Sequence, residues 1–89
     1  MTFSKDPDAV LDYSVDWSLW LAGDEISTSE WRLEEGAPLE QVIASNTATK
    51  ATVWLRGGQA GTTYLVTNRI VTVGGRTDDR TISVKVEDR

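Results

Sequence analysis

Carboxylates are the side chains of this sequence that could do acid–base or metal chemistry. The 89 residues include 14 Asp and Glu, but no His and no Cys. Asp6, Asp8 and Asp12 are close enough in sequence to share a calcium ion, yet the segment lacks the glycine and the terminal glutamate of an EF-hand loop. Paired glycosidase carboxyls need a sugar-sized cleft, for which so small a domain has little room. We therefore interpret these carboxylates as a solvated terminus and a polar strand face, and expect no bound metal.

The residue types that are missing exclude further reactions. Without Cys there are no disulfides or thiol nucleophiles, and without His the usual zinc ligand sets are lost. The glycine clusters at 57–61 and 74–75 are not followed by the Lys-Ser/Thr and helix of a phosphate-binding loop. Hairpin turns account for both clusters. The sequence therefore predicts a protein that uses no cofactor and is not an enzyme.

Tryptophan carries a large share of the energy of many protein interfaces, and this chain has four. Trp17 ends an alternating apolar run and is expected in the core. Trp20 lies three positions later and takes the opposite strand parity, which makes it the first candidate for an exposed anchor. Exposed aromatic rings also suit sugars, so a carbohydrate-binding module stays an alternative.

Arginine and aspartate gather in the segment from Gly75 to Arg80, which is expected to form the tip between the last two strands. Its ion pairs could serve only to keep a hairpin soluble. Alternatively, its arginine forks could bind carboxylates on a neighbouring subunit. The full set of protein-contact candidates is Trp20, Arg69, Arg76, Asp78, Asp79 and Arg80.

The elements that position these residues are predicted to be β-strands, because apolar residues alternate with polar ones from Val10 onward. A loop is expected at Glu35–Pro38, and the segment after it fits a helical period as well as a strand. Strands are expected at 11–17, 26–33 with a bulge, 39–43, 51–56, 63–73 and 81–87. The expected core residues are Tyr13, Trp17, Val53, Tyr64, Val66, Ile70, Ile82 and Val84.

Six or seven short strands in so short a chain are typical of an immunoglobulin-like β-sandwich of about seven antiparallel strands. Gly61-Thr62-Thr63-Tyr64 resembles a tyrosine corner, in which the phenol bonds to upstream backbone. A small closed barrel is the alternative all-β architecture. We expect residues 1–9 to form an N-terminal arm and residues 10–89 the sandwich.

Charge divides the chain unevenly. Residues 1–44 carry ten acids and two bases, whereas residues 45–89 carry four acids and seven bases. Either acidic strands lie beside basic ones within one fold, or an acidic and a basic flank favour head-to-tail packing of copies around a ring. The net charge of −5 disfavours nucleic acid as a partner. No apolar run is long enough for a signal peptide or a membrane span, so we expect cytoplasmic synthesis and no membrane partner.

Two strings stand out: Asp16-Trp17-Ser18-Leu19-Trp20-Leu21 and Gly75-Arg76-Thr77-Asp78-Asp79-Arg80. With Thr52-Val53-Trp54-Leu55 and the tyrosine-corner segment, they resemble a group of small tailed-bacteriophage proteins often labelled fibre-tail adaptor proteins. The similarity runs from about residue 5 to residue 89.

This resemblance implies a non-catalytic virion protein of the neck or tail, made in the cytoplasm of a bacterial host. It would join the head–tail connector or the tail to fibres or to neighbouring virion proteins, in multiple copies of a symmetric assembly. A capsid decoration (cement) protein is the alternative within the virion.

Overall fold

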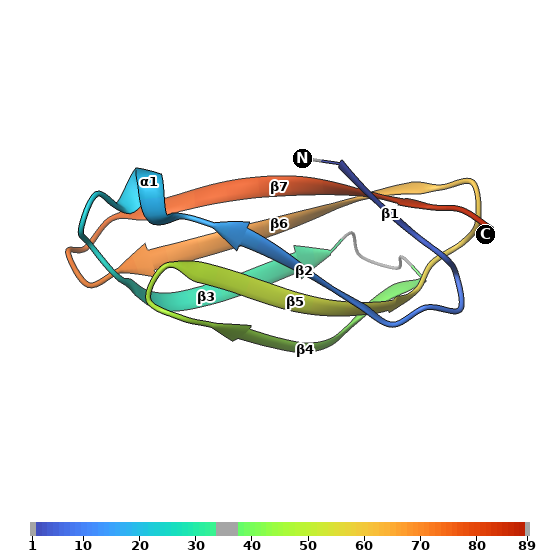
Figure 1. Cartoon of the computed structure of the whole chain (residues 1–89), viewed down its shortest axis with the longest axis horizontal. Coiled ribbons are helices and arrows are strands. Elements are labelled where there is room, and N and C mark those ends of the chain that lie inside the picture. Colours follow the sequence, from blue (N-terminus) through green and yellow to red (C-terminus); the bar gives the residue numbers. More distant parts are fainter. Residues whose placement is uncertain (1, 34–37, 89) are drawn as a thin grey trace.

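The alternation of apolar and polar residues produces two stacked β-sheets (Figure 1). The computed structural model describes residues 2–33 and 38–88. In these ranges the elements are β1 (Thr2–Lys5), β2 (Leu11–Asp16), α1 (Ser18–Leu21), β3 (Ile26–Leu33), β4 (Leu39–Asn46), β5 (Lys50–Gly57), β6 (Thr63–Thr72) and β7 (Thr77–Val86).

The order of the strands identifies the architecture. The larger sheet has the order β1-β7-β6-β3 and the smaller sheet the order β2-β5-β4. Two separate sheets make a sandwich, not a closed barrel. The second, fourth and fifth strands share one sheet and the third, sixth and seventh share the other, as in immunoglobulin-like domains. The predicted all-β sandwich is confirmed.

One strand pair departs from the predicted antiparallel arrangement. β1 runs parallel to β7, whereas the other paired strands are antiparallel. A parallel pair needs a long crossover connection, and here nearly the whole domain lies between the two strands. β1 lies within the predicted N-terminal arm, and the division of the chain into an arm and a sandwich stays a prediction.

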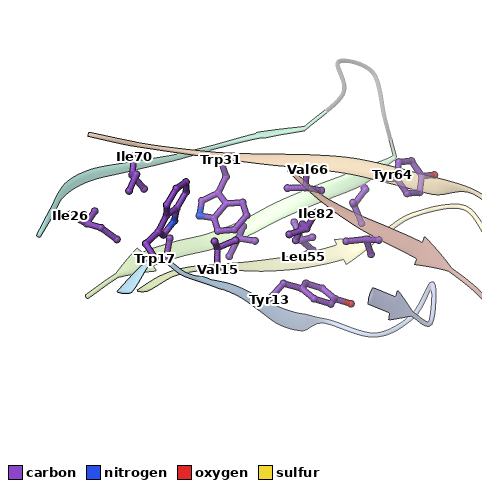
Figure 2. Packing of buried hydrophobic residues seen from close by; sticks show 14 of the residues in the cluster. Tyr13, Val15, Trp17, Ile26, Trp31, Leu55, Tyr64, Val66, Ile70 and Ile82 are labelled. Atoms are coloured by element: carbon purple, nitrogen blue, oxygen red, sulfur yellow. The ribbon is translucent and has the colours of Figure 1, made fainter. Parts of the chain in front are cut away.

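The core forms where the inner faces of the two sheets meet (Figure 2). Val53 and Leu55 of β5 belong to the same buried cluster as Val66 and Ile70 of β6, and all four are fully buried. The eight predicted core residues are all buried, which confirms them: Tyr13, Trp17, Val53, Tyr64, Val66, Ile70, Ile82 and Val84. The tyrosine corner is also present, because the Tyr64 hydroxyl accepts a hydrogen bond from the Gln59 N–H at 2.9 Å.

The structure corrects one predicted strand boundary, the start of the last strand. The predicted bulge lies between Ile26 and Thr28, and the ambiguous segment after the expected loop is the strand β4. The expectation that Gly75–Arg80 forms a turn is wrong, because β7 begins at Thr77 and only residues 73–76 connect it to β6. Backbone pairing with β6 extends β7 through the polar residues, so polarity alone was a poor guide to its start. Except for Pro38, the loop expected at Glu35–Pro38 lies outside the described residues.

Strands from the two halves of the chain lie side by side within the sheets. β1 pairs with β7, β2 and β4 pair with β5, and β3 pairs with β6, so each strand of the acidic half lies beside a strand of the basic half. Arg56 and Glu40, 2.8 Å apart, are one such pair between halves. This arrangement favours the first interpretation of the charge pattern, in which the opposite charges compensate one another within one fold.

Candidate functional site

Helix α1 reverses the side-chain directions that strand parity predicts. Trp17, Trp20 and Leu21 have the spacing of one helix face and pack on the core, while Leu19 points away and is 95% exposed. The Asp16 carboxylate accepts a hydrogen bond from the Ser18 N–H at 2.9 Å, which turns the chain at the end of β2. The expectation that Trp20 faces away from the core is therefore wrong: Trp20 is half-buried, and the exposed apolar residue is Leu19.

Two adjacent tryptophans with an arginine on either side form a stack at this end of the sandwich. The Arg76 guanidinium lies 4.3 Å from the centre of the Trp20 ring, and the Arg80 guanidinium lies 4.3 Å from that of Trp17. Between them, the two indole rings meet edge to face at 5.4 Å. Cation–π contacts of this kind add to the packing of partly desolvated aromatic rings. The stack joins α1 to the β6–β7 hairpin, and three of its members are predicted contact residues.

Hydrogen bonds from Arg76 strengthen the same junction. Its Nη2 donates to the Leu21 carbonyl at 2.8 Å and its Nη1 to the Trp20 carbonyl at 3.4 Å. These carbonyls lie at the C-terminal end of α1. Carbonyls at helix C-termini accept few bonds within the helix and attract cations. Arg80 similarly donates to the Asp16 carbonyl at 3.0 Å. Both arginines therefore bind the chain itself in this structure.

Asp24 connects α1 with the β6–β7 hairpin from the other side. Its carboxylate accepts hydrogen bonds from the N–H groups of Glu25 at 2.8 Å and Gly74 at 3.1 Å, and from Arg76 at 3.2 Å. Hydrogen bonds from the Thr72 hydroxyl and from the Glu25 N–H lower the pKa of Asp24 to about 2. Asp24 is therefore ionised at neutral pH, and it holds the turn together by accepting these hydrogen bonds. Asp24 was not among the predicted site residues, although its place before a strand and after a glycine is typical of a turn residue.

Trp17 of the stack also forms a buried polar pair with Asn68. The Trp17 Nε1–H donates to Asn68 Oδ1 at 2.9 Å, and the Asn68 amide donates to the Ser29 hydroxyl and the Glu30 carbonyl, both at 2.9 Å. Asn68 is fully buried on β6, and its side chain links β6 to β3 and to Trp17 at the start of α1. Asn68 was not among the predicted site residues. The one available signal was a polar residue at an inward position of an apolar strand.

The remaining predicted contact residues lie elsewhere. Arg69 and Asp79 pair across β6 and β7 on the outer face of the larger sheet, with two hydrogen bonds of 2.8 and 3.0 Å. The hydrogen bonds from Arg69 lower the pKa of Asp79, and those to Asp79 raise the pKa of Arg69. Asp78 is half-buried, and its carboxylate accepts the Asp79 N–H at 2.9 Å. The structure thus brings Trp20, Arg76 and Arg80 together at one end and leaves the Arg69–Asp79 pair on a sheet face.

Lys5 connects the two sheets at the opposite end of the sandwich. Lys5 has no exposed surface, and its Nζ donates to the carbonyls of Asp6 and Gly57, both at 2.8 Å. Burial lowers the pKa of this ammonium group. Its hydrogen bonds join the end of β1 to the end of β5, and therefore one sheet to the other.

Residues 2–33 and 38–88 enclose no pocket and place no three carboxylates close enough to share a metal ion. Within the same ranges, α1 is far too short to cross a membrane. Of the large apolar groups on α1 and on the β6–β7 connection, Leu19 and Val73 are exposed, whereas Trp20 is half-buried.

Comparison with known proteins gives the family. A search of curated proteins finds no match. A family model described as "Podophage GP4 fiber-tail adaptor protein gp77" matches residues 5–85. The match begins at the last residue of β1, ends in β7 and includes α1, the stacked arginines and Asn68. The chain therefore belongs to the Podophage GP4 fiber-tail adaptor protein gp77 family.

Proposed function

We propose that this chain is a non-catalytic structural protein of a tailed-phage virion that joins the tail to its fibres. The observation that carries the proposal is the family match over residues 5–85. Its partners are the neighbouring virion proteins of the neck and tail, bound in multiple copies of a symmetric assembly. Many weak contacts held in one assembly give avidity without a tight single contact.

The shape of the molecule supports a joining role. The sandwich measures 41 × 23 × 18 Å. Helix α1 and the β6–β7 hairpin lie at one end of the long axis, and the C-terminus lies at the other (Figure 1). Side-chain hydrogen bonds brace each end. Arg76 and Asp24 hold α1 to the β6–β7 hairpin at the first end, and Lys5 joins β1 to β5 at the second. An elongated domain with two separately braced ends is suited to contact a different protein at each.

Three carboxylates of the described residues have structural roles. Hydrogen bonds lower the pKa values of Asp16, Asp24 and Asp79, chiefly those from Ser18, Thr72 and Arg69. A general acid needs a pKa near neutrality, whereas these groups stay ionised. They serve as hydrogen-bond acceptors in turns and across strands.

Deletion of the coding sequence from the phage genome tests the proposal. Particles from the deletion strain and from a strain complemented with the wild-type chain would be purified, and their proteins quantified by mass spectrometry. We expect the deletion particles to retain head and tail proteins and to lose the fibre proteins, and complementation to restore them. Fibres present at normal copy number on particles without this chain would refute the adaptor role. Destabilised heads with intact fibres would indicate capsid decoration.

A further inference from the structure

Strand β4 is an open edge of the smaller sheet. In the order β2-β5-β4 it pairs with β5 on one side, and no described strand pairs with its other side, at the margin of the molecule in Figure 1. Every residue from Glu40 to Asn46 is exposed, although a strand inside a sandwich normally buries every second side chain. Both faces and one edge of this part of β4 are therefore open to solvent.

The other three edge strands carry features that keep sheet edges from pairing. Natural edge strands are commonly short, charged, bulged or covered. β1 has only four residues, β2 carries two aspartates, and β3 carries a glutamate, an arginine and a bulge. β4 also has a bulge, but the regular segment that follows it, Ile43–Asn46, contains no charge and no proline. Among the described strands, β4 is thus the edge best suited to accept another strand.

The hydrogen-bond pattern indicates which backbone groups of β4 point outward. The Thr47 N–H donates to the Lys50 carbonyl at 2.8 Å, and antiparallel strands repeat such hydrogen-bonded pairs at every second residue. By this alternation Ile43 bonds to β5, whereas the N–H and C=O groups of Ala44 and Asn46 point away from β5. A row of outward N–H and C=O groups is complementary to the backbone of another extended segment.

An apolar pair lies beside the open edge. Ile43 is directly opposite Trp54 of β5 on the outer face of the smaller sheet, and the two are 59% and 39% exposed. Side chains that lie opposite each other on neighbouring strands stabilise the pairing of the strands. A strand added to β4 would place one of its side chains beside Ile43, where an apolar group would continue the row that Trp54 begins.

The net charge disfavours a second copy of this chain as the added strand. Each chain carries −5, so two copies joined along β4 would bring like net charges together. We propose that the free edge of β4 binds an extended segment of a different virion protein, which pairs with the backbone of Ala44 and Asn46 and places an apolar side chain beside Ile43. This inference rests on the proposed function and names a surface through which the adaptor contacts a partner.

Complementation of the deletion strain with variant chains tests this assignment. Ala44→Pro removes an outward N–H but no hydrogen bond to β5, and proline is tolerated at such edge positions. Ala44→Val is its matched control, because it keeps the N–H. Ile43→Asp removes the apolar side chain, and Leu65→Asp is its control, because Leu65 is 55% exposed on β6 of the larger sheet. The copies of the chain and of the fibre proteins per purified particle would be counted by mass spectrometry.

We expect Ala44→Pro and Ile43→Asp to lower the chain or the fibre proteins per particle by roughly tenfold or more, and both controls to match wild type. Loss of the chain would support binding of the edge to the tail, and loss of the fibres alone would support binding to the fibre. Wild-type amounts of both for Ala44→Pro and Ile43→Asp would overturn the proposal.

Measurements on the purified chains complete the test. A loss confined to variants whose urea midpoint lies below that of their control would overturn the proposal, because unfolding would then explain the loss. So would a dimer of the isolated wild-type chain that Ala44→Pro dissolves, since the added strand would then come from a second copy. Absence of the wild-type chain from complemented particles would instead refute the proposed function itself.

Discussion

Replacement of two buried tryptophans by phenylalanine separates the contribution of a buried hydrogen bond from that of packing. Trp17 is fully buried and its Nε1–H donates to Asn68 Oδ1. Trp31 is 9% exposed, and its Nε1–H has no hydrogen-bond partner among the described residues. The two indoles lie in the same core (Figure 2) and differ in this hydrogen bond and in the contacts of the Trp17 ring with Trp20 and Arg80, to which a Phe at position 17 still offers an aromatic ring. Trp17→Phe and Trp31→Phe therefore form a matched pair.

The expected difference follows from the group that each replacement leaves behind. Both variants remove the same atoms, so the loss of buried surface and the cost of a cavity largely cancel between them. Trp17→Phe also leaves Asn68 Oδ1 without its donor in the core, which costs about 1–3 kcal/mol. Trp31→Phe removes an unpartnered N–H and leaves no acceptor unsatisfied. We expect Trp17→Phe to be less stable than Trp31→Phe by about 1–3 kcal/mol.

Urea unfolding followed by far-ultraviolet circular dichroism measures this difference without relying on tryptophan fluorescence. For a domain of this size, each 1 kcal/mol lowers the melting temperature by roughly 4–8 °C, so thermal unfolding gives a second readout. Trp54→Phe is the exposed control, since Trp54 is 39% exposed, and little change is expected. Equal destabilisation of the two core variants, or a larger loss for Trp31→Phe, would refute the argument from the buried hydrogen bond.

Three further predictions concern the two ends of the sandwich. Gly74→Ala would place a Cβ 2.8 Å from Asp24 Oδ2, and the resulting crowding should destabilise the chain by about 1–3 kcal/mol, measured as a lower urea midpoint. Lys5→Met should cost about 1–3 kcal/mol, because the carbonyls of Asp6 and Gly57 lose their donor; an unchanged midpoint would contradict this. The pKa of Asp24 falls from 3.8 to about 2 on folding, so its contribution is present above about pH 4 and is lost as the pH falls toward 2. Asp24→Asn should therefore be less stable than wild type at pH 6, with a gap that narrows by pH 2, and a gap independent of pH would contradict the assignment.

The fold could largely be predicted from the sequence because apolar and polar residues alternate along most of its strands. Alternation located β2, β3, β5 and β6 and the residues that fill the core, and the Gly-Thr-Thr-Tyr segment indicated the tyrosine corner. β1 was not predicted, because four residues with one apolar side chain carry no periodic signal. The start of β7 was placed too late because Asp78 and Asp79 resemble turn residues, whereas pairing with β6 decides their conformation.

The candidate site was predicted less well, and one local feature explains most of the difference. A four-residue helix follows β2, so strand parity failed at Trp20 and the exposed residue became Leu19. The arginines were identified by type, but their actual contacts depend on distant partners such as Asp24 and the carbonyls of α1. No local pattern contains that information. Whether Trp20, Arg69, Arg76, Asp78, Asp79 and Arg80 contact another protein stays a prediction.

The central claim is that this sandwich is the joint between the tail and the fibres of a phage particle, and its most direct test is the position of the chain in that particle. Electron cryomicroscopy of intact virions, reconstructed without imposed symmetry at the portal vertex, would locate a domain of 41 × 23 × 18 Å. We predict repeated copies between tail and fibre, each touching both. Copies spread over the capsid surface, or a particle without this domain, would contradict the account.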